Sequence, residues 1–134
     1  MKRLYIIFFF LIVSKAFAET PIETAIMGHL NEEEQYEINT VLTGRVNGYE
    51  TDLTVVQWAL LGPTYWRNYV SVFTYQKVEL DTKGVPGLVD NIQLKNGIIS
   101  LNVKLKGPDD PRCCPSVIGE SRFHIVGNEL VALP

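Results

Sequence analysis

The chain has 134 residues, of which 46% are hydrophobic and 20% are charged, and its formal net charge at pH 7 is −3. This acidic balance argues against nucleic acid and anionic membrane surfaces as partners, because both attract basic patches. The length suits one domain that can bury a sizeable hydrophobic core.

The first 18 residues have the three-part pattern of a secretory signal peptide. Lys2 and Arg3 form a positive start, residues 4–13 are an unbroken apolar run, and Ala16-Phe17-Ala18 is a small-x-small cleavage site. The apolar run is too short to span a bilayer comfortably, and an uncleaved anchor is the alternative. We therefore predict a signal peptide over 1–18 and a single periplasmic or secreted domain over 19–134, with no membrane segment after cleavage.

A short helix is predicted directly after the cleavage site. Thr20 suits the N-cap position, Pro21 the first helical position, and Glu23 completes a capping box. Apolar residues then recur at helical spacing as far as Leu30, and Asn31 is the expected stop.

The period changes to two at Tyr36, which predicts β-strands from there onward. Three strands are expected, over residues 36–42, 53–61 and 69–80. In the third, the apolar side chains change face between Phe73 and Val78, which indicates a bulge or bend. Residues 81–87 contain two glycines and a proline and are predicted to form a turn.

Two hairpins follow. Asn96-Gly97 is the preferred type I′ pair, and folding about it places Leu94 opposite Ile99, Ile92 opposite Leu101, and Leu88 opposite Leu105. Gly127-Asn128 is a type II′ signal, and folding about it places Ile125 opposite Leu130 and Phe123 opposite Ala132. The predicted fold class is therefore α+β, with a short N-terminal helix packed on a curled, mostly antiparallel sheet of about six strands.

The chemically unusual segment is the Cys-Cys-Pro box at residues 109–116. The candidate functional residues in it are Asp109, Asp110, Arg112, Cys113, Cys114 and Ser116. Adjacent Cα atoms lie about 3.8 Å apart, closer than the roughly 4.4 Å that ordinary disulfides require. An exported protein nevertheless meets oxidising conditions, so a structural vicinal disulfide is predicted, with a reduced or intermolecular pair as the alternative.

Other chemistry has weaker support in this segment. Asp109 and Asp110 are expected to lie in a solvated turn, where Arg112 offsets their negative charge. This interpretation is favoured over a catalytic pair, so no catalytic residue is assigned. A zinc site needs about four ligands at suitable spacing, and only His29 and His124 are available to join the cysteines. No metal and no cofactor are therefore expected.

Tyr65, Trp66 and Arg67 form a candidate recognition loop between the second and third predicted strands. Loop aromatics are favoured at interfaces. The alternative is that they fold back and plug one end of the sheet.

The residues from about 50 to the C-terminus resemble a known group of proteins. The similarity is carried by Leu53 to Phe73, Asn91 to Ile99, the box Asp109-Asp110-Pro111-Arg112-Cys113-Cys114-Pro115-Ser116, and the hairpin Gly127-Asn128-Glu129-Leu130. They are similar to small exported bacterial proteins of unknown function with a C-terminal Cys-Cys-Pro-Ser/Thr box, including LppP/LprE-type lipoproteins. The resemblance implies an exported domain with the cysteines at its functional or structural centre. This chain lacks the lipidated cysteine, and it has Tyr65-Trp66-Arg67 where related loops tend to be rich in glycine.

These patterns favour a non-enzymatic binding or interaction domain, whose partner is another periplasmic or envelope protein. The alternative is a thiol-redox or soft-metal-responsive protein that uses Cys113 and Cys114. A hydrolase built on Asp109 and Asp110 ranks last.

The cleavage site makes a direct prediction. The mature protein should begin at Glu19 and fractionate with soluble exported contents, because Ala16-Phe17-Ala18 matches the signal-peptidase pattern. Intact-mass analysis of the fractionated protein tests this. A mass that includes residues 1–18, found in the membrane pellet, would contradict it.

Overall fold

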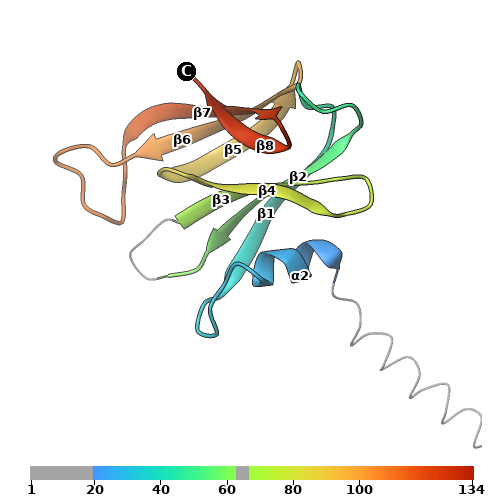
Figure 1. Ribbon diagram of the computed structural model, residues 1–134. Helices are drawn as coiled ribbons and strands as arrows, with labels where there is room; N and C mark the ends of the chain where they lie inside the picture. The colour runs from blue at the N-terminus through green and yellow to red at the C-terminus, as the bar shows by residue number, and fades with distance from the viewer. Residues whose placement is uncertain (1–19, 63–66) are drawn as a thin grey trace, which may run out of the picture.

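The computed structural model describes residues 20–62 and 67–134. This part of the chain forms one helix and eight strands, whose arrangement is shown in Figure 1. Their bounds are α2 Pro21–Met27, β1 Tyr36–Gly44, β2 Leu53–Leu60, β3 Arg67–Phe73, β4 Glu79–Val85, β5 Leu88–Lys95, β6 Ile98–Leu105, β7 Val117–Val126 and β8 Glu129–Leu133. The signal peptide prediction falls outside these described residues.

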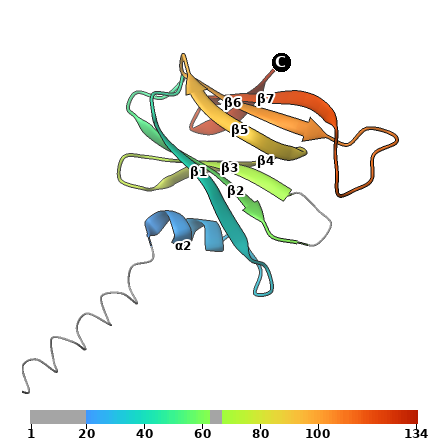
Figure 2. The same ribbon diagram turned by 180° about the vertical axis from the view of Figure 1, so that it is seen from behind.

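The strands form two antiparallel sheets of four, in the orders β1-β2-β3-β4 and β5-β6-β7-β8. Each strand pairs with its neighbour in sequence, so each sheet is a simple meander. Figures 1 and 2 show the second sheet on one side of the first sheet and α2 on the other. The first sheet is therefore the middle layer of three.

The middle position of the first sheet follows from the composition of β2. This strand is an almost continuous apolar run, and its residues from Leu53 to Trp58 are all buried. Leu53 and Val55 face the second sheet and belong to the larger core, whereas Val56 and Trp58 pack with Ile26 of α2 in a second core. A strand that is apolar on both sides requires cover on both sides.

Helix α2 forms as its start signals predict. Thr20 is the N-cap, its Oγ1 atom accepts a hydrogen bond of 3.1 Å from the Glu23 backbone N–H, and Pro21 occupies the first turn. The helix ends at Met27 with Gly28 as its C-cap, so the predicted continuation to Asn31 is wrong. Ile26 is fully buried against the first sheet.

The predicted fold class is wrong in its strands and sheets. The protein is mostly β, with eight described strands in two sheets, where about six strands in one curled sheet were expected. Residues 69–80 do not form one long strand, because the chain turns between Thr74 and Val78 and returns as β4. Lys77 adopts a positive φ of 66° in this turn, and a lysine gives no sequence signal for that conformation. The predicted turn at 81–87 is in fact largely β4.

Both predicted hairpins form, with two corrections. Leu94 pairs with Ile99, Ile92 with Leu101, Ile125 with Leu130, and Phe123 with Ala132, as predicted. Leu88 pairs with Lys104 and not with Leu105, because the register shifts between Val89 and Asn91. Gly127 and Asn128 both have positive φ, which is type I′ geometry and not the predicted type II′.

The loop between β1 and β2 ties the two sheets together. The Asn47 backbone N–H donates to the Gly97 carbonyl at 2.7 Å, and the Asn47 carbonyl accepts from the Ile125 N–H at 2.9 Å. One residue thus binds the tip of the β5–β6 hairpin and strand β7. Gly48 has a φ of +96°, and a Cβ atom there would lie 1.7 Å from the Ile125 carbonyl oxygen. The close contact between the Gly48 backbone and the Ile125 carbonyl therefore requires glycine at position 48.

Side chains link the sheets at two further places. The Asp81 carboxylate on β4 accepts a 2.8 Å hydrogen bond from the Leu130 N–H on β8. The buried amide of Asn68 on β3 donates at 2.8 Å to the Gly87 carbonyl, just before β5, and accepts from Gln57. These bonds give hydrogen-bond partners to polar groups that would otherwise be buried without one. They therefore help to fix the position of the second sheet relative to the first.

Replacing Gly48 by Ala should lower the free energy of unfolding by about 4 kcal/mol or more, because it combines strain at positive φ with overpacking. Gly127 is the matched control, since its φ is +58° but a Cβ atom there meets nothing within 4 Å. Gly127→Ala should cost only about 1–2 kcal/mol. Urea unfolding of both variants measures the difference, and equal losses would contradict the role assigned to the Asn47–Gly48 contact.

Candidate functional site

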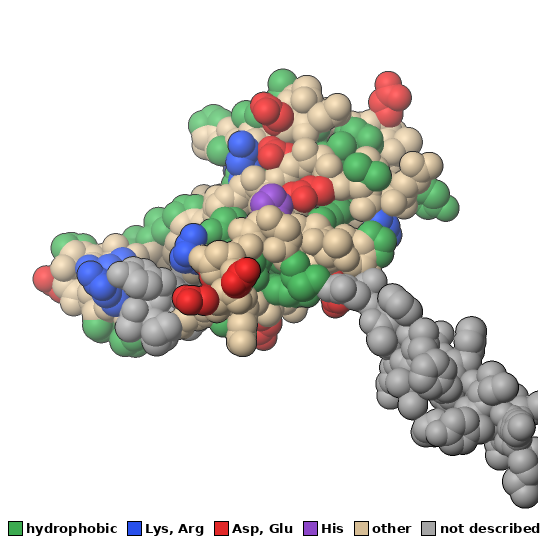
Figure 3. All heavy atoms as spheres, turned by 60° about the horizontal axis from the view of Figure 1, so that its bottom comes forward, with side chains coloured by type: hydrophobic (Ala, Val, Ile, Leu, Met, Phe, Trp, Pro, Cys, Tyr) green, Lys and Arg blue, Asp and Glu red, His purple; other side chains and the backbone are tan. Residues whose placement is uncertain are grey.

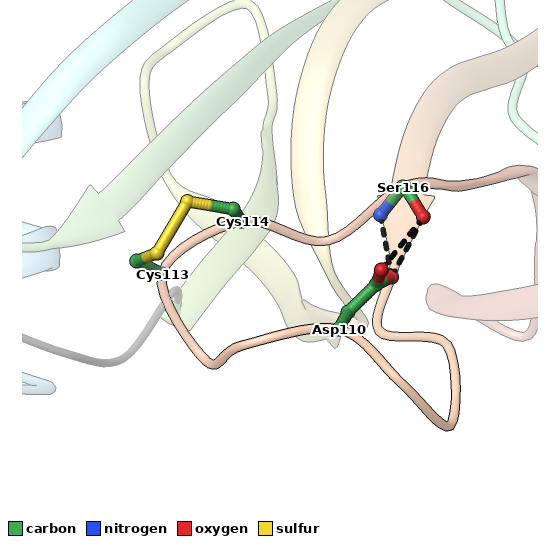
Figure 4. The surroundings of a disulfide bond; sticks show 4 residues. All are labelled: Asp110, Cys113, Cys114 and Ser116. Atoms are coloured by element: carbon green, nitrogen blue, oxygen red, sulfur yellow. Dashed lines mark hydrogen bonds between the residues drawn. A yellow bond between two sulfur atoms is a disulfide. The ribbon is translucent and has the colours of Figure 1, made fainter.

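The Cys-Cys-Pro box lies in the loop of residues 106–116, which joins β6 to β7. Figures 1 and 2 show this loop, in orange, projecting beyond the end of the two sheets. Its two stems are joined by one carboxylate. Asp110 Oδ2 accepts from the backbone N–H groups of Gly107 at 2.7 Å and Ser116 at 2.9 Å, and the Ser116 hydroxyl lies 2.9 Å from Oδ1 (Figure 4). We call this arrangement the Asp110 clamp.

The clamp depends on the charge of the carboxylate. The pKa of Asp110 is lowered, first by the Gly107 N–H and then by the hydroxyl and N–H of Ser116, all of which favour the ionised form. Gly107 is itself suited to this position. A Cβ atom there would come within 3.1 Å of both the Asp110 carboxylate and Val117.

The two cysteines lie at the exposed end of the loop, away from the clamp. Their sulfur atoms are 2.34 Å apart, at disulfide distance, and their Cα atoms are 3.8 Å apart. Figure 4 shows the pair across the loop from Asp110 and Ser116. The predicted vicinal pair is therefore confirmed. Both residues are exposed.

The structure brings together only part of the candidate segment. Asp110 and Ser116 meet in the clamp, whereas Asp109 and Arg112 lie on the exposed outside of the loop. Because the Asp110 carboxylate binds backbone groups at both stems, its geometry is that of a loop-closing residue and gives no support to a catalytic pair with Asp109.

Of the candidate recognition loop, Tyr65 and Trp66 fall outside the described residues. Arg67 is the first residue of β3. Its guanidinium lies 3.4 Å from Glu34 Oε2 and donates at 3.2 Å to the Tyr69 hydroxyl. Arg67 thus belongs to a second feature, on the face of the first sheet that carries α2.

That feature is a cleft of about 200 Å³, and sequence reasoning missed it. It is lined by residues from the loop after α2 and from β2, β3 and β4, namely His29, Glu34, Trp58, Leu60, Arg67, Tyr69, Thr82 and Gly84. Figure 3 looks onto this side of the molecule, where a histidine lies among acidic and basic side chains. We call it the α2-side cleft.

A chain of polar contacts runs from the buried interior to the surface of this cleft. The Trp58 indole N–H donates at 2.9 Å to the Ser71 hydroxyl, which lies 2.6 Å from the Thr82 hydroxyl. Thr82 donates in turn to Glu79, whose Oε2 atom is 2.6 Å from His29 Nε2. Ser71, between the apolar residues Val70 and Val72, was a sequence signal for this network, since a buried hydroxyl needs a partner.

The comparisons with known proteins give no family. No family model, no curated protein and no solved structure matches this chain. Within residues 20–62 and 67–134, no helix is long and apolar enough to cross a membrane. The same residues contain no group of three or more His, Cys, Asp or Glu placed to hold a metal ion.

The Asp110 clamp should respond to acid. Because the folded pKa is lowered, the clamp stabilises the loop fully above the unfolded value of about 3.9, and this contribution is lost as pH falls through the folded pKa. The protection factors of the Gly107 and Ser116 amides, which are their hydrogen-exchange rates relative to the unprotected rate at the same pH, should therefore fall only in acid. Asp110→Asn should lower both protection factors at neutral pH as well.

Asp109→Asn is the matched control, because it removes the neighbouring carboxylate, which is exposed. It should leave both amides protected at neutral pH. Equal exchange rates in the two variants would show that Asp110 does not close the loop.

Proposed function

We propose that this chain is an exported, non-enzymatic interaction domain that presents the 106–116 loop to another periplasmic or envelope protein. The observation that carries the proposal is the Asp110 clamp, which closes the base of a projecting loop and leaves its tip exposed. The export signal at residues 1–18 and the likeness of the Cys-Cys-Pro box to LppP/LprE-type proteins belong to the same proposal.

A loop closed in this way is suited to recognition. Binding a flexible loop costs the entropy of ordering it, and a loop that is already ordered avoids most of that cost. The tip offers Arg112, a residue type enriched at interfaces. Ile118, two residues after the clamp, is 85% exposed and supplies apolar surface beside the loop.

The vicinal cysteines have a structural role in this proposal. They lock the tip of the loop, whereas the clamp closes its base. Adjacent cysteines enclose almost no chain, so their bond removes little entropy from the unfolded state. Their loss should therefore lower stability modestly and leave the presented surface in place.

A second candidate function is thiol chemistry at Cys113 and Cys114. The observation that favours it is the exposure of both cysteines, because thiol–disulfide exchange requires access to sulfur. In this case a dithiol reductant would reduce the bond and be oxidised to its own disulfide. The two thiols released on this chain would then be available to a soft metal ion.

Site-specific photo-crosslinking in cells tests the proposal. A photoreactive residue at Ile118 should capture a discrete exported partner, and Asp110→Ala should abolish the capture while the domain remains folded. Val126 is the matched control position. It lies at the other end of β7, is 54% exposed and has the same strand parity, so crosslinking there should not depend on Asp110.

The Cys113→Ser/Cys114→Ser double variant separates the two candidates. The interaction proposal expects the Ile118 crosslink to persist. Loss of the crosslink, together with tight one-to-one Hg(II) binding by the reduced wild type and an unchanged melting temperature in the variant, would instead establish thiol chemistry. Absence of any crosslink at Ile118 in the wild type would overturn the interaction proposal.

A further inference from the structure

The α2-side cleft contains an aromatic ring, that of Tyr69, which lies between a second aromatic ring and a glycine. Trp58, Tyr69 and Gly84 are successive cross-strand neighbours on β2, β3 and β4. The Trp58 and Tyr69 rings stack with centroids 4.5 Å apart and an interplanar angle of 18°, so Trp58 covers one face of Tyr69. On the other side stands Gly84, which has no side chain to cover the ring.

The space over Gly84 is part of the cleft. A Cβ atom at Gly84 would lie 3.9 Å from Tyr69 Cε1, in ordinary van der Waals contact, and Gly84 does not have a positive φ. Backbone conformation therefore does not require glycine here. What glycine provides is room beside the ring, within a cleft of about 200 Å³ that also reaches His29, Arg67 and Thr82.

The charged groups around this space are already paired. Arg67 contacts Glu34 at 3.4 Å, and His29 contacts Glu79 at 2.6 Å. The second oxygen of Glu34 accepts a 2.9 Å hydrogen bond from the Asn31 N–H, and Glu79 also accepts from Thr82. Among the described residues that line the cleft, an ionic ligand thus meets no charged group that lacks a partner, so its desolvation cost would not be recovered.

Hydrogen-bonding capacity nevertheless remains. Arg67 has five N–H groups, and two of its nitrogens hold Glu34 and Tyr69, which leaves donors on a side chain that is 56% exposed. His29 uses Nε2 for Glu79, and its side chain is 42% exposed. The Tyr69 hydroxyl can donate as well as accept. These hydrogen-bonding side chains match a ligand that carries hydroxyl groups, because a hydroxyl group can both donate and accept a hydrogen bond.

We propose that the α2-side cleft binds a single neutral sugar ring, a pyranose unit, stacked on Tyr69 over Gly84. The ring's C–H face would contact the electron-rich aromatic face, and its hydroxyls would meet Arg67 and His29. The volume suits one such unit, because drug-sized ligands occupy cavities of roughly 300 Å³ or more. This site is separate from the 106–116 loop and does not depend on the interaction proposal.

NMR titration of the mature wild-type protein tests the ligand class with three related probes. Glucose is neutral, glucuronate carries a negative charge and glucosamine a positive one. We expect glucose to shift the amide signals of Tyr69 and Gly84 and the indole signal of Trp58, with a Kd on the order of 1 mM. Both charged sugars should bind at least about fivefold more weakly.

Two variants locate the site. Gly84→Leu places a side chain against the open face of Tyr69 and should abolish binding. Asn102→Leu is its matched control, because it places the same side chain on an exposed strand position of the second sheet. It should bind as the wild type does. Arg67→Met, at an exposed rim position, should weaken binding about tenfold in a folded protein even if Gly84→Leu proves unstable.

Three outcomes would overturn the inference. They are no shift with glucose, tighter binding of either charged sugar than of glucose, or unchanged binding in folded Gly84→Leu or Arg67→Met. Asp110→Asn should leave sugar binding unchanged, which keeps this result distinguishable from that of the loop proposal.

Discussion

Strand β2 places apolar side chains on both faces of the first sheet, and water cannot be left against either face at low cost. Leu53 and Val55 are fully buried under the second sheet, and Val56 and Trp58 under α2. The rest of the architecture follows from this double burial. It requires cover on both faces of the first sheet, which the second sheet and α2 provide. The loop after α2 then reaches Glu79 of β4, where the α2-side cleft lies.

The two candidate sites differ in how the fold builds them. The 106–116 loop is local, because the Asp110 clamp joins residues only three and six positions away. The α2-side cleft is assembled from distant segments, and His29 and Glu79 are separated by 50 positions. A change in the core would therefore disturb the cleft before it disturbed the loop, and each site can be altered by substitution without the other.

Local signals accounted for the parts of the fold that the sequence could predict. Asn96-Gly97 specified a turn, and the alternating apolar residues beside it specified the register, so Leu94 and Ile99 could be paired correctly. The vicinal cysteines were also visible in the sequence. Strand β4 was missed because Lys77, with its positive φ, gives no turn signal. The second sheet and the cleft were missed because they rest on contacts between distant residues, such as Asn47 with Ile125, which no local pattern reports.

The clamp has a consequence for how this domain can diverge. Its hydrogen bonds involve only three positions, Gly107, Asp110 and Ser116, while the residues between Asp110 and Ser116 make the exposed tip. Substitutions in the tip can therefore accumulate without changing the packing of either hydrophobic core. The two meanders would then act as a fixed frame for a segment whose sequence can change, as an antibody framework carries its variable loops.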